Sequence, residues 1–177
     1  GGFIAAAASE HDWTGQILLI PSPRLAGFGR WASAAWAATL CKAKDTDGRT
    51  WEGGSAPIVV LSGDEARTQR LLGGPRNLLS VVFWVDDPGG GDADLTRDAW
   101  GVARTMYDAH VRQILFDGRP VIRVNLPDLA PATIAAACYL WLHASVAAAA
   151  LSRVDPLAMP VADQWRDIQA EIAEDLG

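Results

Sequence analysis

The sequence predicts an α/β fold, a three-layer αβα sandwich with a mainly parallel sheet. Four short runs of apolar and β-branched residues alternate along the chain with longer segments of helical character. Such runs are typical of strands that helices cover on both faces, and the alternation favours parallel strands joined by helical crossovers. The predicted strands are 16–20, 57–61, 78–85 and 120–126. No internal repeat or low-complexity linker divides the 177 residues, so we expect a single domain over 1–177.

The first half of the chain alternates between helix, strand and loop. Alanine-rich residues 3–9 are interpreted as the end of a helix, and two prolines end the first strand. Residues 25–43 then predict a helix, and 45–54 predict a polar, glycine-rich loop. After the second strand, a short helix ends near Gly73. This half therefore supplies two strand-to-helix units.

The second half contains the strongest strand, 78–85, in which nearly every residue is a β-former. The helix over 95–116 is amphipathic, with a predicted apolar stripe of Leu95, Ala99, Ala103, Met106, His110 and Ile114. The next strand alternates polar with apolar residues and is interpreted as an edge strand. A last helix begins at Pro160, with a predicted buried stripe of Val161, Trp165, Ile168, Ile172 and Leu176.

Composition and charge exclude several classes of function. Half of the residues are apolar and the net charge is -6, which argues against a nucleic-acid surface because phosphate neutralisation needs clustered Lys and Arg. Residues 129–151 carry no charge and are long enough to span a bilayer. That segment is mostly alanine and contains Pro131 and His143, so we expect a central buried helix and no membrane partner. Cys41 and Cys138 form no Cys-x-x-Cys pair and are predicted to be buried and reduced, as in a cytoplasmic protein without metal or cofactor.

A glycine motif, G-x-G-x-x-A over 27–32, resembles a dinucleotide-binding turn only superficially. In such a site the first glycine follows the strand at once, whereas here residues 21–26 intervene. We therefore expect the two glycines to lie inside a helix and to allow close packing on the sheet.

The three histidines, His11, His110 and His143, are scattered, so a His-based metal site is not expected. His110 lies on an apolar stripe and is interpreted as a packed side chain. His143, in the uncharged helix, either packs in the same way or faces a site or a subunit interface.

Polar residues follow several strands at the edge where α/β proteins bind ligands. Ser22 follows the first predicted strand and Ser62 the second, and the segments 86–91 and 125–128 follow the other two. Either serine can help the N–H groups of the next helix to hold a phosphate, or it can form a turn or helix cap.

Four segments resemble, in chain order, the C-terminal sugar-isomerase (SIS) domain of phosphoglucose isomerase, as found in bifunctional transaldolase/phosphoglucose isomerase enzymes. They are ILLIPSPRLAGFG over 17–29, the helix 31–42, GRPV with LPDL over 118–129, and DPLAMP over 155–160. The resemblance implies an SIS-like sandwich and a place as the C-terminal part of a longer protein. It also implies a sugar-phosphate ligand, a homodimer, and an N-terminal SIS or transaldolase domain that carries the main phosphate-binding loop.

The departures from the family pattern concern catalysis. The family's Gln and its proton-moving Glu correspond to Ala34 and Ala38, and alanine cannot relay a proton. The family's Asn and Gln of the last motif correspond to Asp155 and Met159, and its ring-opening Lys corresponds to Arg166, which stays charged at any working pH. The substrate-binding candidates that remain are Ser22, Thr39, Lys42, Ser62 and Asp155.

Two main functions therefore stay open, and a nucleotide-binding regulator is kept as a third on the G-x-G-x-x-A match alone. The first is a degenerate SIS domain of carbohydrate metabolism with a structural or regulatory role, or with weak sugar-phosphate binding. The alternative is an active glucose-6-phosphate isomerase module of glycolysis or gluconeogenesis, in which Glu52 or Asp45 replaces the missing base. Among the eight tryptophans, Trp36, Trp51 and Trp100 either form a packing interface or belong to the core.

Overall fold

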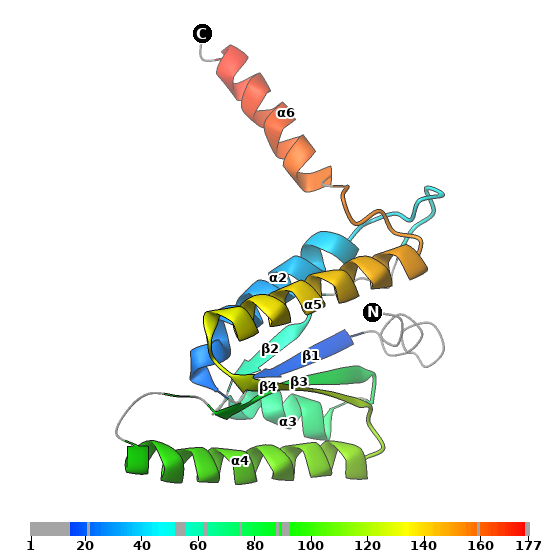
Figure 1. Cartoon of the computed structure of the whole chain (residues 1–177). Helices are drawn as coiled ribbons and strands as arrows, with labels where there is room; N and C mark the ends of the chain where they lie inside the picture. The colour runs from blue at the N-terminus through cyan, green and yellow to red at the C-terminus, as the bar shows by residue number, and fades with distance from the viewer. Residues whose placement is uncertain are drawn as a thin grey trace.

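A computed structural model describes residues 15–20, 22–51, 56–61, 64–74, 76–87, 89, 93–158 and 160–175. Within these residues a four-stranded sheet lies between two layers of helices, which confirms the predicted αβα sandwich (Figure 1). The strands are β1 (Gly15–Ile20), β2 (Ile58–Leu61), β3 (Leu78–Asp87) and β4 (Val121–Asp128). The helices are η1 (Pro23–Leu25), α2 (Ala26–Leu40), α3 (Glu65–Gly73), α4 (Ala93–Phe116), α5 (Pro131–Leu151) and α6 (Pro160–Asp175). The helix expected over 3–9 lies outside the described residues.

The strand order is β2-β1-β3-β4, and all three pairs are parallel. Leu18 of β1 lies opposite Val59 of β2 and Val81 of β3, so β1 and β3 are central. β4 lies at the edge, as its alternating sequence predicted. Figure 1 shows α2 and α5 on one face of the sheet and α3 and α4 on the other. α2 follows β1 on one face of the sheet, and α4 follows β3 on the other face. The order in which strands are added therefore reverses between β1 and β3, which makes this the topological switch point of the sheet.

Each face of the sheet carries its own core. On the α2/α5 face, Phe83 of β3 packs edge-on against Phe28 and Trp141. Trp141 Nε1 also donates a buried hydrogen bond of 2.7 Å to the Ala32 carbonyl, which joins α5 to α2. On the α3/α4 face, Trp84 stacks on Trp100 at 4.6 Å between ring centroids. Trp36 is buried, and Trp51 and Trp100 pack against the cores, so the core interpretation holds for all three.

Of the two glycines in the motif, Gly29 allows close helix-to-sheet packing as expected, whereas a Cβ on Gly27 would meet no atom within 4 Å. A Cβ on Gly29 would lie 2.9 Å from Ile20 Cγ1 and 3.1 Å from Val59 Cγ1, which is closer than real Cβ contacts. Both glycines lie inside α2, after η1, rather than directly after β1.

Two helices are much more exposed than the sequence predicted. α5 buries only a narrow stripe, Ala137, Trp141, Ser145, Ala148 and Ala149, so the expectation of a central buried helix was wrong. The predicted burial of the α6 stripe was also wrong at Trp165, Ile168 and Ile172, which are 61%, 41% and 53% exposed. The side chains of its other two members, Val161 and Leu176, lie outside the described ones. α5 is apolar on all sides and α6 has the apolar spacing of a packed helix, but the described part of the chain leaves much of both helices uncovered.

Smaller corrections concern α4 and the cysteines. Among the α4 side chains from 99 onward, which the structure describes, Tyr107, Val111 and Ile114 are buried, whereas Met106 of the predicted stripe is exposed, so the buried face is rotated from the prediction. The side chain of Leu95 lies outside the described ones. Cys41 is exposed at the end of α2 and Cys138 is half-buried, so neither fits the predicted full burial.

Candidate functional site

The structure brings together two segments that the family resemblance singled out, at the C-terminal end of α2. Lys42 Nζ donates hydrogen bonds to the Ala38 carbonyl, one turn back, and to the Ala158 carbonyl of the segment between α5 and α6. Asp155 lies in the same segment, where its Oδ1 accepts a 2.9 Å hydrogen bond from the Leu157 N–H. We call the group of Ala38, Thr39, Lys42 and the segment 155–158 the α2 corner.

The loop after α2 closes over the α2 corner. The Thr46 N–H donates to the Arg153 carbonyl at 2.7 Å, and Asp47 forms an ion pair of 3.3 Å with Arg153. Asp45 Oδ1 accepts hydrogen bonds from the backbone N–H groups of Asp47 and Arg49, at 2.9 and 2.8 Å. These bonds fix the loop, so Asp45 acts as a turn residue. Glu52 lies outside the described residues.

Among the described residues of the α2 corner, the one carboxylate is that of Asp155, whose Oδ1 accepts the Leu157 N–H as a turn residue does. Ala38, at the family's glutamate position, exposes only its methyl group. The Thr39 hydroxyl is buried and hydrogen bonded to the carbonyls of Ala35 and Trp36, at 3.1 and 2.9 Å. Arg166 lies on α6, where every described side chain from 165 to 173 is exposed. The corner therefore offers the Lys42 ammonium, backbone carbonyl groups and the Asp155 carboxylate, and no titratable group at the position of the family's glutamate.

Ser22 lies at the other end of the molecule. It is 2% exposed and follows β1, and its carbonyl accepts a 3.0 Å hydrogen bond from the Leu25 N–H, which makes it a turn residue. α2 begins at this edge and runs back for 15 residues, about 22 Å, before it reaches Thr39 and Lys42. Ser22 therefore cannot join Thr39, Lys42 and Asp155 around one sugar phosphate within one copy. Ser62 lies outside the described residues.

The carboxyl edge of the sheet is occupied by structural contacts. Arg24 donates a hydrogen bond to the Gly89 carbonyl, which links the segments that follow β1 and β3. Asp128, at the end of β4, accepts hydrogen bonds from the Thr133 hydroxyl and the Ala130 N–H and so holds the start of α5. These bonds lower the pKa of the Asp128 carboxyl.

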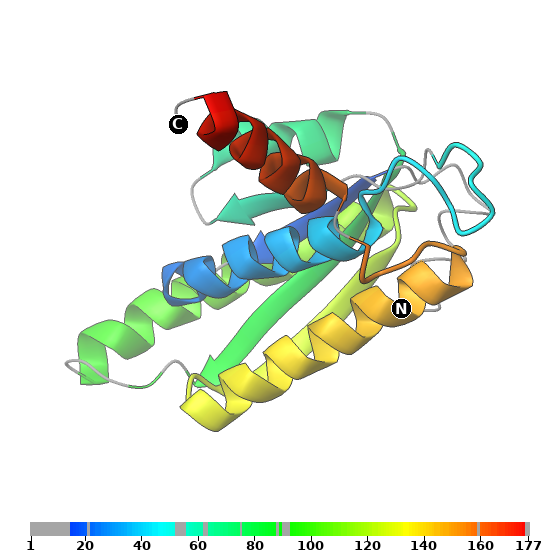
Figure 2. The same cartoon turned by 90° about the horizontal axis from the view of Figure 1, so that it is seen from above.

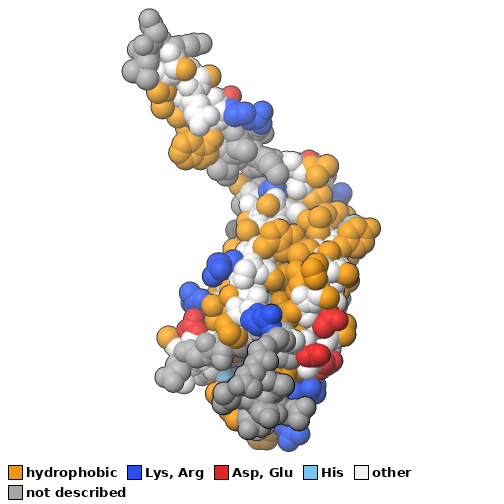
Figure 3. All heavy atoms as spheres, turned by 60° about the vertical axis from the view of Figure 1, so that its left-hand side comes forward, with side chains coloured by type: hydrophobic (Ala, Val, Ile, Leu, Met, Phe, Trp, Pro, Cys, Tyr) orange, Lys and Arg blue, Asp and Glu red, His pale blue; other side chains and the backbone are white. Residues whose placement is uncertain are grey.

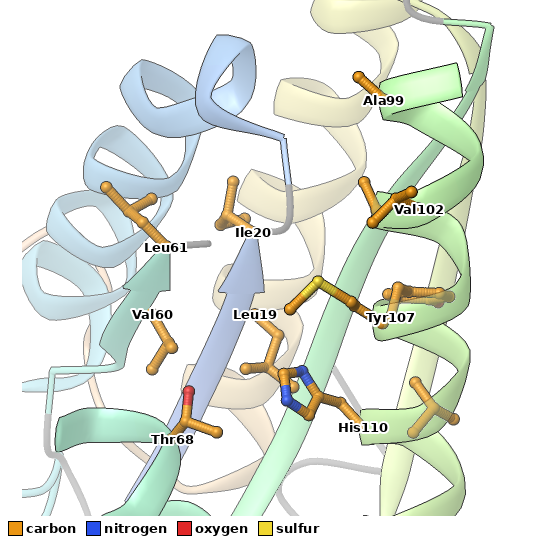
Figure 4. A pocket seen from close by; sticks show the side chains of 12 residues that line it. Leu19, Ile20, Val60, Leu61, Thr68, Ala99, Val102, Tyr107 and His110 are labelled. Carbon is orange, nitrogen blue, oxygen red and sulfur yellow. The ribbon is translucent and has the colours of Figure 1, made fainter. Parts of the chain in front are cut away.

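Sequence reasoning missed a pocket of about 280 Å³ between α3 and α4. Its floor is Leu19 of β1 and Val60 of β2, and its wall includes His110, whose ring projects from α4 toward β1 (Figure 4). Ala99 and Ala103 also line the pocket. These two small residues lie one helical turn apart, and this spacing is the sequence feature that could have indicated a pocket beside α4. The lining of the pocket is mostly apolar, and His110 is half-buried among these hydrophobic side chains. His110 therefore forms part of the pocket wall.

Two tests on the described part of the chain narrow the possibilities. No group of three or more His, Cys, Asp or Glu side chains there could hold a metal ion. One helix, α5, is long and apolar enough to cross a membrane by length and composition, a property that it shares with core helices of soluble proteins. α5 also packs on α2 and on the sheet, as a helix of an αβα sandwich does.

Comparison with known proteins defines the fold. No protein-family model and no curated protein matches this chain. A solved structure, the hypothetical protein TT0462 from Thermus thermophilus, superposes with a TM-score of 0.77 at 14% sequence identity. The match covers 97% of this chain and 44% of the Thermus chain, so the present chain spans less than half the length of that protein. This likeness shows that the chain has the same α/β fold as part of the Thermus protein.

Proposed function

We propose that this chain is a degenerate SIS-type domain of the phosphoglucose isomerase kind, cytoplasmic, with a structural or regulatory role inside a larger assembly. The observation that carries the proposal is the α2 corner, where a methyl group, Ala38, stands at the position of the family's proton-moving glutamate. Aldose–ketose isomerisation moves a proton between neighbouring carbons and needs a group that accepts and returns it. Neither Ala38 nor the hydrogen-bonded Thr39 hydroxyl can do so, and the Asp155 carboxylate of the corner is engaged as a turn residue by the Leu157 N–H.

The electrostatics of the α2 corner also predict weak binding of a sugar phosphate. The corner lies at the C-terminal end of α2, where the helix dipole presents partial negative charge and disfavours an anion. The Lys42 ammonium is already hydrogen bonded to two carbonyl groups. A phosphate would therefore need cations from another domain, and the fold match to less than half of a longer protein is consistent with such a second domain.

Titration calorimetry with fructose 6-phosphate, beside a coupled isomerase assay in both directions, tests this proposal. We expect a dissociation constant of about 1 mM or weaker and no turnover above the uncatalysed rate. Lys42→Met should weaken any binding that occurs at the corner, and Lys44→Met, on the adjoining loop, is the matched control. Turnover by the purified chain would refute the proposal.

The alternative of an active glucose-6-phosphate isomerase keeps one supporting observation. The loop that carries Asp45 is joined to the α2 corner through Thr46 and Arg153, which brings its acidic residues near the site. If the assay detects turnover, Glu52→Ala and Asp45→Asn identify the base, because only the true base should lower the rate by about a hundredfold or more.

A further inference from the structure

The pocket between α3 and α4 lies at the edge of the sheet where α/β proteins bind ligands. The strands contribute their last two residues to it, Leu19 and Ile20 from β1 and Val60 and Leu61 from β2. α4 forms one wall, and Figure 2 shows that this helix begins beyond the carboxyl end of β3. The pocket therefore lies beside the switch point between β1 and β3, where this class of fold holds small molecules.

The lining of the pocket carries no Lys, Arg, Asp or Glu side chain. Apart from Thr68, Tyr107 and His110, every lining residue is apolar. A phosphate or carboxylate in the pocket would lose water without gaining a cation, which is costly. The lining therefore fits an uncharged, mainly apolar ligand.

Two polar side chains, Thr68 of α3 and His110 of α4, lie at one end of the pocket. Figure 4 shows both of them at the end away from Ala99 and Val102. The Thr68 hydroxyl donates a 2.9 Å hydrogen bond to the Asp64 carbonyl, so its oxygen remains an acceptor. No described residue is hydrogen bonded to the His110 ring. A ligand with one N–H or O–H group at this end would therefore meet an acceptor, while the rest of the ligand meets apolar side chains.

The volume of the pocket limits the size of the ligand. An engineered cavity of about 150 Å³ binds benzene, and this pocket has about 280 Å³. A two-ring molecule of about ten non-hydrogen atoms therefore fits. Figure 3 shows a second apolar surface along α5, where Tyr139 and Leu140 are 65% and 57% exposed. The α3–α4 pocket differs from that surface because it combines a hollow with hydrogen-bonding groups at one end.

We propose that the α3–α4 pocket binds a small, uncharged two-ring aromatic molecule whose N–H or O–H group donates to the Thr68 oxygen. The rings lie on Leu19 and Val60, and the small side chains of Ala99 and Ala103 leave room for them. This site goes beyond the proposed SIS-type role, because its ligand carries no phosphate. It is also independent of that role, because none of its residues belongs to the α2 corner.

Indole is the probe, and NMR of the full chain labelled with ¹³C-methyl methionine measures its binding. The chain has two methionines, and the signal of Met106, which lines the pocket, is identified by its loss in Met106→Leu. We expect a saturable shift of this signal with a dissociation constant of about 0.1–1 mM. Indole adsorbed on α5 would leave this signal in place. An unmoved Met106 signal at about 5 mM indole overturns the proposal.

Two variants test the volume and the acceptor separately. Ala103→Leu occupies the pocket and should weaken indole binding at least about tenfold. Ala109→Leu makes the same change on the exposed side of α4 and should leave binding unchanged. Thr68→Val keeps the shape, removes the acceptor and should weaken indole about fivefold. Benzofuran, which has two similar rings and no donor group, should bind Thr68→Val and wild type equally.

Three results would overturn the proposal even if indole shifts the Met106 signal. Full binding by Ala103→Leu would place indole outside the pocket. An equal effect of Thr68→Val on indole and on benzofuran would show that the hydroxyl does not recognise the donor. Fructose 6-phosphate should leave the Met106 signal unmoved, and a shift would show that the pocket accepts a charged sugar phosphate.

Discussion

Replacing Gly29 with alanine tests the packing of α2 on the sheet. The added Cβ would lie 2.9 Å from Ile20 Cγ1, 3.1 Å from Val59 Cγ1 and 3.4 Å from Ile20 Cδ1. Neither side chain can swing away freely, because Ile20 is 1% exposed in the core and Val59 packs against the same core. The helix must then move outward or a core rotamer must change, at a cost of about 1–3 kcal/mol. The intrinsic preference for alanine over glycine inside a helix offsets about 1 kcal/mol of this.

The expected net result for Gly29→Ala is a loss of up to about 2 kcal/mol in the free energy of unfolding. Gly101→Ala is the matched control, because Gly101 lies inside α4 and a Cβ there meets no atom within 4 Å. The control should gain up to about 1 kcal/mol. Urea denaturation followed by tryptophan fluorescence measures both variants. If Gly29→Ala gains as much stability as Gly101→Ala, the close approach of α2 to β1 and β2 is wrong.

Three further changes probe other contacts. Trp141→Phe removes the buried hydrogen bond to the Ala32 carbonyl and should cost about 1–3 kcal/mol in urea denaturation; a loss below about 0.5 kcal/mol would count against that bond. Ala103→Leu adds volume to the α3–α4 pocket and should raise the melting temperature, whereas a lower one would mean that the pocket has no room. Asp128→Ala should lower stability at neutral pH, because hydrogen bonds from Thr133 and Ala130 hold the pKa of this carboxylate below its ordinary 3.8. That contribution is complete above pH 3.8 and is lost as the pH falls through the lowered pKa, so the melting temperatures of wild type and variant should converge in acid.

The four strands and their alternation with helices could be predicted because each strand has a recognisable sequence pattern. Leu78 to Val85 is buried at every position, and a fully buried parallel strand needs a continuous apolar run. β4 differs because Arg123 and Asn125 alternate with apolar residues, and this pattern predicted its place at the edge. In both cases the local sequence reflects what covers the strand.

The exposure of α5 and α6 could not be predicted in the same way. An apolar stripe such as Trp165, Ile168 and Ile172 indicates that a helix is to be covered, but it does not indicate which chain covers it. The separation of Ser22 from Lys42 has a different cause, since both lie near the ends of one helix in the sequence. A helix that crosses the sheet returns the chain to the opposite edge, so residues close in sequence are placed about 22 Å apart. The α3–α4 pocket arises from small side chains, Ala99 and Ala103, which a hydrophobic pattern counts as apolar without regard to their size.

Lys42 connects the α2 corner with the exposed helices. Its ammonium neutralises the carbonyl end of α2, which otherwise presents partial negative charge beside the segment 155–158. The same group holds the Ala158 carbonyl, two residues before α6 begins. A lysine that released its carbonyl partners to bind a phosphate would also release the Ala158 carbonyl, two residues before α6. If a phosphate binds at the α2 corner as proposed above, it must therefore compete with the Ala38 and Ala158 carbonyls for the Lys42 ammonium.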